Sequence, residues 1–267
     1  MNIKIKMLAG AIGSLICASA YAVPDLQLNI TGGIYDNVTE TVIVTGGTTA
    51  TVNAYMAVTG KNALTDTYAL SVALSPQTGP DNVDLGSFVI AGLTVDVTVD
   101  MVYGVPPLET VWTQDSDPGD LATHSIFDTF FKELSFSFDE NSMTASVNTQ
   151  DTPGYDPTSN VGSDLYYKQF AIDTSALAED IALHFDLYNL KICADASKQC
   201  QAVADADQSN FAPFSHDAEW RPGGFEPPPP APGIPEPAPL ALVALGGILL
   251  GWMTRKLAAS GDHRSEE

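Results

Sequence analysis

The most reactive-looking stretch of this chain is residues 215–219, which read Ser-His-Asp-Ala-Glu. A serine, a histidine and two carboxylates are the groups that hydrolases use as nucleophile, base and orienting acid. Adjacent residues of an extended segment point to opposite sides, so we do not expect Ser215 and His216 to pair locally. The sequence also contains no G-x-S-x-G and no H-E-x-x-H motif. We therefore expect a non-catalytic protein, with this stretch a polar surface segment or a buried histidine beside Asp217 or Glu219; a hydrolase is the alternative.

Clustered aspartates suggest a second kind of chemistry, the binding of a hard cation. Asp115, Asp117 and Asp120 lie in one turn-like segment beside a Pro-Gly pair, where carboxylate oxygens can converge on Ca²⁺. Asp205 and Asp207 form a second, weaker group, with Asp217 and Glu219 nearby in sequence. Neither group is an EF-hand, because the twelfth position of each lacks the bidentate glutamate. Calcium is thus a hypothesis to set against solvated acidic turns, and no other cofactor is expected.

Two further groups of polar and aromatic residues have ordinary structural interpretations. Asp96 and Asp100 are expected on the solvent face of one strand, in alternation with apolar residues. Aromatic rings near turns either pack against the core or stack on sugars. The residues to which this applies are Trp112, Tyr155, Tyr166 and Tyr167.

Two cysteines, Cys193 and Cys200, remain once the N-terminal segment that holds Cys17 is set aside. An even pair in an exported chain predicts a disulfide that clamps a hairpin or the base of a loop. No histidine motif accompanies the pair, so a zinc site built on it is not expected.

The elements that must position these groups are short strands. Apolar and polar residues alternate with period two in about ten segments, separated by Gly, Pro and Asp turns. This pattern predicts an all-β chain, with a single antiparallel β-sandwich or jelly-roll-like domain over residues 23–220. Short helices are expected over residues 125–132 and near residues 175–180. The expected strands lie at residues 26–30, 39–45, 51–59, 68–74, 87–90, 93–102, 134–138, 143–147, 169–172 and 181–192.

The chain is strongly acidic, with 33 Asp and Glu against 11 Lys and Arg and a formal net charge of −22. Such a field repels nucleic acid and anionic lipid surfaces, and it favours solubility and association with cations. Nucleic acid is therefore excluded as a partner.

The two ends of the chain predict where the protein is delivered. Residues 1–22 have a basic start, an apolar run and small residues before Val23, as in a secretory signal peptide. Residues 221–233 are a Pro/Gly-rich linker, expected to be a stiff spacer. Residues 234–257 contain an uncharged stretch about 24 Å long as a helix, slightly short of the hydrocarbon core, so interfacial flanks must help it to span. Residues 258–267 would be a cytoplasmic tail.

The C-terminal segment has a specific resemblance. Pro235, Glu236 and Pro237, the uncharged stretch, and then Arg255 and Lys256 resemble the PEP-CTERM sorting signal of Gram-negative bacteria. The resemblance implies that Pro235 to Pro237 are recognised by exosortase, a membrane-embedded peptidase-transpeptidase of species that make extracellular polysaccharide. It implies a helix that anchors the protein in the inner membrane transiently. The tail after Lys256 is longer than is usual for such signals.

The body is similar to the choice-of-anchor N proteins, a family of exported domains with different C-terminal anchors and no assigned activity. The segments that carry this resemblance are residues 23–28, 33–36, 130–138, 148–151, 183–188 and 211–219.

We therefore expect an exported, non-catalytic protein of the cell surface or extracellular matrix. It would be an exosortase substrate associated with exopolysaccharide, as in a biofilm, on the surface of a Gram-negative bacterium or released from it. The alternative within the binding class is a calcium-dependent glycan-binding module.

Overall fold

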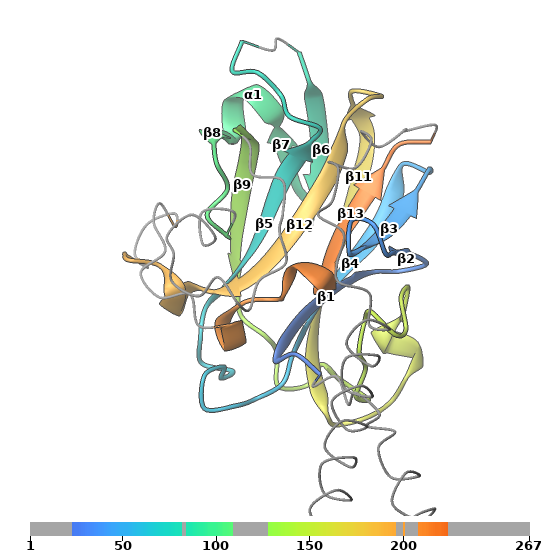
Figure 1. Cartoon of the computed structure of the whole chain (residues 1–267), viewed down its shortest axis with the longest axis vertical. Coiled ribbons are helices and arrows are strands. Elements are labelled where there is room, and N and C mark those ends of the chain that lie inside the picture. The colour runs from blue at the N-terminus through green and yellow to red at the C-terminus, as the bar shows by residue number, and fades with distance from the viewer. Residues whose placement is uncertain (1–22, 82–83, 109–127, 196–199, 201–207, 224–267) are drawn as a thin grey trace, which may run out of the picture. The chain divides into compact units, whose positions relative to one another are not determined.

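The structure is a computed structural model that describes residues 23–81, 84–108, 128–195, 200 and 208–223. In this part of the chain the expectation of an all-β protein is confirmed: two sheets face each other, with only short helical turns (Figure 1). The first sheet has the order β1-β4-β11-β6-β7, with β10 paired to β11. Its strands are β1 (Leu26–Ile30), β4 (Thr49–Met56), β6 (Gly86–Ile90), β7 (Leu93–Asp96), β10 (Met143–Thr144) and β11 (Leu165–Leu177).

The second sheet has the order β2-β3-β13-β12-β5-β9-β8. Its strands are β2 (Ile34–Asp36), β3 (Thr41–Thr45), β5 (Tyr68–Ser75), β8 (Val102–Gly104), β9 (Thr129–Phe136), β12 (Ala182–Asn189) and β13 (Asp217–Arg221). The helical pieces are α1 (Val97–Asp100) and 3-10 turns at Pro157–Ser159, Leu190–Ile192, Gln208–Asn210 and Phe214–His216.

The main core lies between the two sheets and is built from every second residue of the strands. Leu26, Leu28 and Ile30 of β1 are fully buried in it, as are Leu183 and Phe185 of β12 from the opposite sheet. Burial of each such side chain stabilises the fold by about 1.5–3 kcal/mol. In β1 and β12 the alternating apolar pattern of the sequence therefore identifies the inner face correctly.

The predicted single strand over residues 93–102 is wrong. It ends at Asp96, where the side chain accepts hydrogen bonds from the N–H groups of Thr98 and Val99 and caps the turn α1. Asp100 accepts in turn from the N–H of Asp96. An aspartate whose side chain accepts hydrogen bonds from the next free N–H groups favours a helical turn over a continued strand. Asp96 and Asp100 are exposed, and they act as local caps.

The two predicted helices are also absent from the described residues. The described part of the first, residues 128–132, leads into β9, and the second falls where β11 continues to Leu177. Both segments have residues with adequate helix propensity, but pairing with β5 and with β6 decides their conformation.

The prediction of a purely antiparallel sandwich needs one correction. β13 pairs antiparallel with β12 on one side but parallel with β3 on the other. β13 also extends to Arg221, so the residue that opens the expected linker is instead the buried end of a central strand. β13 was not predicted as a strand, because its alternate positions are charged.

Cys193 and Cys200 form the predicted disulfide. Cys193 directly follows the 3-10 turn Leu190–Ile192, and both cysteines are buried in a small cluster with Tyr188 and Phe211. The bridge thus fixes the chain where it leaves β12. Among the described residues no helix is long and apolar enough to cross a bilayer.

Candidate functional site

Several predicted site residues fall outside the described part of the chain. These are the aspartates of the calcium hypothesis, one aromatic residue and the sorting motif: Asp115, Asp117, Asp120, Asp205, Asp207, Trp112, Pro235, Glu236, Pro237, Arg255 and Lys256. The proposals that involve them remain predictions.

The three described aromatic candidates do not form one sugar-stacking face. Tyr166 and Tyr167 are consecutive on β11, and Tyr166 packs against the main core. Tyr167 and Tyr155 pack against a separate small cluster around Tyr55. The Tyr155 ring meets that of Tyr55 edge-on at a centroid distance of 6.1 Å, so its role is packing.

Ser215 and His216 do pair, contrary to the sequence-based expectation. Residues 214–216 form a 3-10 turn, which brings Ser215 Oγ to 2.9 Å from His216 Nδ1. His216 Nε2 lies 3.0 Å from Asn148 Oδ1, which also accepts from the N–H of Gln150, so Nε2 carries the proton. Burial lowers the pKa of His216 to about 4. A histidine that is 4% exposed and so weakly basic fits a structural hydrogen-bond chain better than a general base.

The outer face of the seven-stranded sheet carries a buried polar cluster on two adjacent strands. On β12, His184 and Asp186 alternate with the core residues, and on β13 Asp217, Glu219 and Arg221 do the same. The register pairs His184 with Glu219 directly. Because side chains alternate across a strand, all five project to the same side of the sheet. Every residue of β13 is buried, and in β12 every residue except His184 is buried, so both faces of these two strands are covered.

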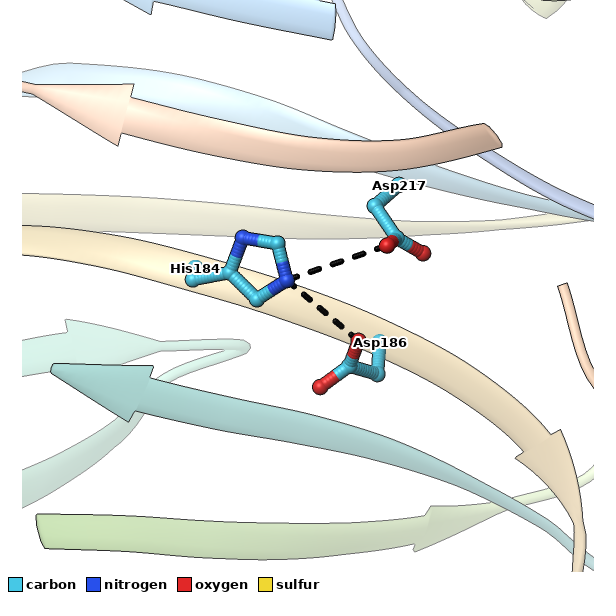
Figure 2. Close-up of side chains that lie close together, drawn as sticks. All are labelled: His184, Asp186 and Asp217. Carbon is cyan, nitrogen blue, oxygen red and sulfur yellow. Dashed lines mark ion pairs between the residues drawn. The ribbon is translucent and has the colours of Figure 1, made fainter. Parts of the chain in front are cut away.

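Three of these side chains converge on one point (Figure 2). His184 Nε2 lies 3.3 Å from Asp186 Oδ1 and 3.8 Å from Asp217 Oδ2, and one ligand-type atom from each residue lies within 4.8 Å of the others. Asp186 and Asp217 are buried, whereas the His184 side chain is 13% exposed. We call His184, Asp186 and Asp217 the triad.

Glu219 and Arg221 flank the triad. Arg221 Nε and Nη2 donate to the two carboxylate oxygens of Glu219 at 2.6 and 3.2 Å, and Glu219 Oε2 lies 3.8 Å from His184 Nδ1. Burial alone would raise the pKa of Glu219, but the hydrogen bonds from Arg221 and the nearby His184 ring hold it below its ordinary value. Burial lowers the pKa of His184, but the nearby carboxylates of Asp186, Glu219 and Asp217 raise it well above the ordinary value. The charge of each of these two residues therefore depends on its charged neighbours on this face of the sheet.

Glu133 of β9 lies two strands from Asp186 on the same face, because each is opposite Ser71 of β5. Its Oε2 accepts a hydrogen bond from the N–H of Cys200 at 2.9 Å, and its Oε1 has no hydrogen-bond partner. Burial raises the pKa of Glu133 to about 7, and the Cys200 N–H offsets only part of that rise.

This shift predicts that Glu133 makes the fold less stable as pH rises. Between pH 4.5 and 7 the folded chain keeps the proton that unfolded Glu133 releases, so the free energy of unfolding falls with pH in this window. After discounting for partial exposure, we expect a loss on the order of 1–2 kcal/mol. Urea unfolding of wild type and Glu133→Gln at pH 4.5 and 7.5 measures it. The wild type should lose this amount relative to the variant, and parallel pH profiles would contradict the assignment.

The sequence contains a signal for the cluster that was missed. Charged residues at every second position, between apolar residues that are themselves core-forming, occur in residues 183–187 and again in residues 217–221. That pattern normally indicates a strand with one solvent face. Only the pairing of β12 with β13 shows that the two charged rows meet.

The fold places the chain among all-β proteins with two facing sheets. No family model matches the sequence, and no curated protein matches it. Among solved structures, that of AvmM, described as catalysing macrocyclisation in alchivemycin A biosynthesis, aligns over 77% of this chain and 91% of its own. The sequence identity is 13% and the TM-score 0.32.

Proposed function

We propose that this chain is an exported, non-catalytic protein of the cell surface or extracellular matrix, delivered by an exosortase-type sorting system. The observation that carries the proposal is the order of segments at the C-terminus: Pro235, Glu236 and Pro237, an uncharged stretch, and then the basic pair Arg255 and Lys256. A basic pair after an apolar segment favours a cytoplasmic end, which leaves the motif on the outer side. Residues 1–22 have the features that direct export.

The body of the protein is compatible with this route. The disulfide between Cys193 and Cys200 suits an oxidising compartment outside the cytoplasm. β13 ends at Arg221, and the proline-rich residues that follow supply a spacer between the sandwich and the sorting motif. In this proposal the segment 234–257 spans the inner membrane of a Gram-negative bacterium until exosortase cleaves it, and the domain is then held at the surface or released.

A shallow depression on the six-stranded sheet supports association with extracellular polysaccharide. Its lining combines apolar residues, among them Ala50, Val89 and Ile172, with the hydroxyl groups of Thr31, Thr49 and Thr51 and the carboxylate of Asp173. Such groups donate and accept the hydrogen bonds that orient a polar ligand in a binding site. This depression also supports the second candidate function, a glycan-binding module. If that module depends on calcium, a chelator will abolish its binding.

The sorting proposal predicts a large, discrete change in mass. In a host with exosortase, the wild-type chain should lose the segment after the Pro235–Pro237 motif, and it should leave the membrane fraction. Replacing Glu236 by alanine should preserve the C-terminal segment and keep the protein in the inner membrane, because the peptidase no longer recognises its motif. Intact-mass spectrometry of membrane and extracellular fractions measures both outcomes.

Glu226→Ala is the matched control, because Glu226 also precedes a proline but lies in the spacer. It should be processed like the wild type. A full-length mass that persists with and without exosortase would contradict sorting and leave the segment as a plain anchor.

In the same fractions, the wild type should co-purify with exopolysaccharide, and Asp173→Asn should reduce its recovery. Equal recovery would place any sugar binding elsewhere.

A further inference from the structure

The triad has an arrangement that an ion pair does not require. One imidazole nitrogen, His184 Nε2, faces two carboxylates at once, from the same strand and from the neighbouring one (Figure 2). Two atoms bound to one zinc ion at about 2.0–2.1 Å in a tetrahedron are separated by about 3.4 Å. The separations from His184 Nε2, 3.3 Å to Asp186 Oδ1 and 3.8 Å to Asp217 Oδ2, lie close to that value. Two of the three separations thus suit a shared ion, and the third, between the two carboxylate oxygens, is within 4.8 Å.

The burial of Asp186 is the second, independent observation. Its side chain is only 1% exposed, and neither of its carboxylate oxygens makes a hydrogen bond. The 3.3 Å approach of His184 meets an ion-pair distance but not hydrogen-bond geometry. A buried carboxylate normally accepts several hydrogen bonds or coordinates a metal, because its desolvation is otherwise uncompensated. Asp186 therefore has unused coordinating capacity directed at the triad.

The charges of the cluster favour a divalent cation. Three carboxylates, those of Asp186, Asp217 and Glu219, are buried with one guanidinium, that of Arg221, and one imidazole. The carboxylates outnumber the guanidinium, so the cluster has an excess of negative charge that a divalent cation can compensate. Since uncompensated charge is costly in a buried site, a bound cation lowers that cost.

The ligand types choose between metals. Calcium and magnesium prefer sites made of oxygen atoms alone, whereas an imidazole nitrogen with carboxylate oxygens suits zinc and its neighbours in the first transition series. The other ring nitrogen, His184 Nδ1, lies 3.8 Å from Glu219 Oε2, and Arg221 holds that carboxylate. Metal-bound histidines are commonly oriented by such an outer carboxylate. This set of contacts therefore resembles a carboxylate–histidine–zinc arrangement.

We propose that His184, Asp186 and Asp217 bind a divalent transition-metal ion, with zinc as the ion that fits best. The site joins β12 to β13 within the sheet, and none of its residues belongs to the sequence segments on which sorting depends. The partly exposed edge of His184 gives an ion access to it. The metal would act as a structural crosslink between the two strands, in which binding energy adds to folding energy.

The test uses the full chain, stripped with chelator and titrated with Zn²⁺. We expect binding of one equivalent, measured by calorimetry and by elemental analysis after dialysis, together with a rise in Tm that EDTA reverses. His184→Gln and Asp186→Asn should each weaken Zn²⁺ binding by more than the roughly 10–100-fold that loss of an outer-shell partner costs. Ca²⁺ should bind much more weakly than Zn²⁺.

Glu133→Gln is the matched control, since it removes a half-buried carboxylate from the same sheet face outside the triad. It should retain wild-type zinc affinity. Zinc binding by the wild type tests the proposal directly, so the test remains decisive even if a variant folds poorly. Absence of stoichiometric Zn²⁺ binding to the wild type would overturn the proposal, as would equal affinity of wild type and a folded Asp186→Asn. Preference for Ca²⁺ would overturn the assignment to a transition metal.

Discussion

Replacing Gly86 by alanine is expected to cost roughly 2–5 kcal/mol of stability, enough to unfold a marginal domain. Gly86 opens β6 with φ +79°, a conformation that residues with a Cβ rarely adopt. A Cβ built there would overlap the carbonyl oxygen of Ala176, where β11 resumes pairing with β6 after a register shift. Because the obstacle is backbone, relief requires the two strands to separate. Urea unfolding with tryptophan fluorescence measures the loss.

Gly92→Ala separates the two contributions to this effect. Gly92 has nearly the same backbone conformation, φ +80°, in the turn between β6 and β7, but a Cβ there would meet no atom within 4 Å. The control should therefore lose only the conformational part, about 1 kcal/mol. Equal losses for the two variants would show that β11 does not approach Gly86 as closely as the structure has it.

The strands that could be predicted from sequence are those with one face in the main core. In β1, β5 and β12, apolar residues alternate without interruption, and the prediction found all three. The turn α1 could not be found by alternation, because its Asp96 cap conflicts with the strand pattern on which the prediction rested. β13 was missed because its alternate positions are charged. Its parallel pairing with β3, which lies far away in the sequence, could not be predicted either.

The candidate site was less predictable than the fold. Ser215 and His216 are adjacent in sequence and have the residue types of a nucleophile and a base. In the structure they lie in a 3-10 turn, where they form part of a hydrogen-bond chain around the buried His216. The residues that the structure brings together, His184, Asp186 and Asp217, are separated by about thirty positions of sequence at their widest. Charged residues at every second position of a strand normally indicate a face exposed to solvent. In this protein the outer face of β12 and β13 is covered, so the same pattern gives a buried polar cluster. Whether a face is covered is decided by the tertiary structure and cannot be seen in the local sequence.

Replacing Arg221 by methionine should destabilise the chelator-treated protein by about 3–5 kcal/mol. Arg221 forms a two-point contact with Glu219, at 2.6 and 3.2 Å, and both residues are buried on β13. The pair itself adds little net stability, because desolvation of both groups offsets their attraction. Its removal on one side is costly, because it leaves a buried carboxylate beside Asp217 without its strongest partner. Urea unfolding in EDTA gives the change without any contribution from metal.

The double variant Glu219→Gln with Arg221→Met decides whether this reasoning is right. If the cost comes from the abandoned carboxylate, removing its charge should recover most of the stability, and the two substitutions should be strongly non-additive. If Arg221 instead stabilises mainly through the packing of its aliphatic stem, methionine already replaces that packing and the single variant should lose little. A large loss that the second substitution does not reverse would mean that Arg221 compensates another carboxylate of the cluster. In that case the charges on β12 and β13 act as one group, and no single pair within it can be treated separately.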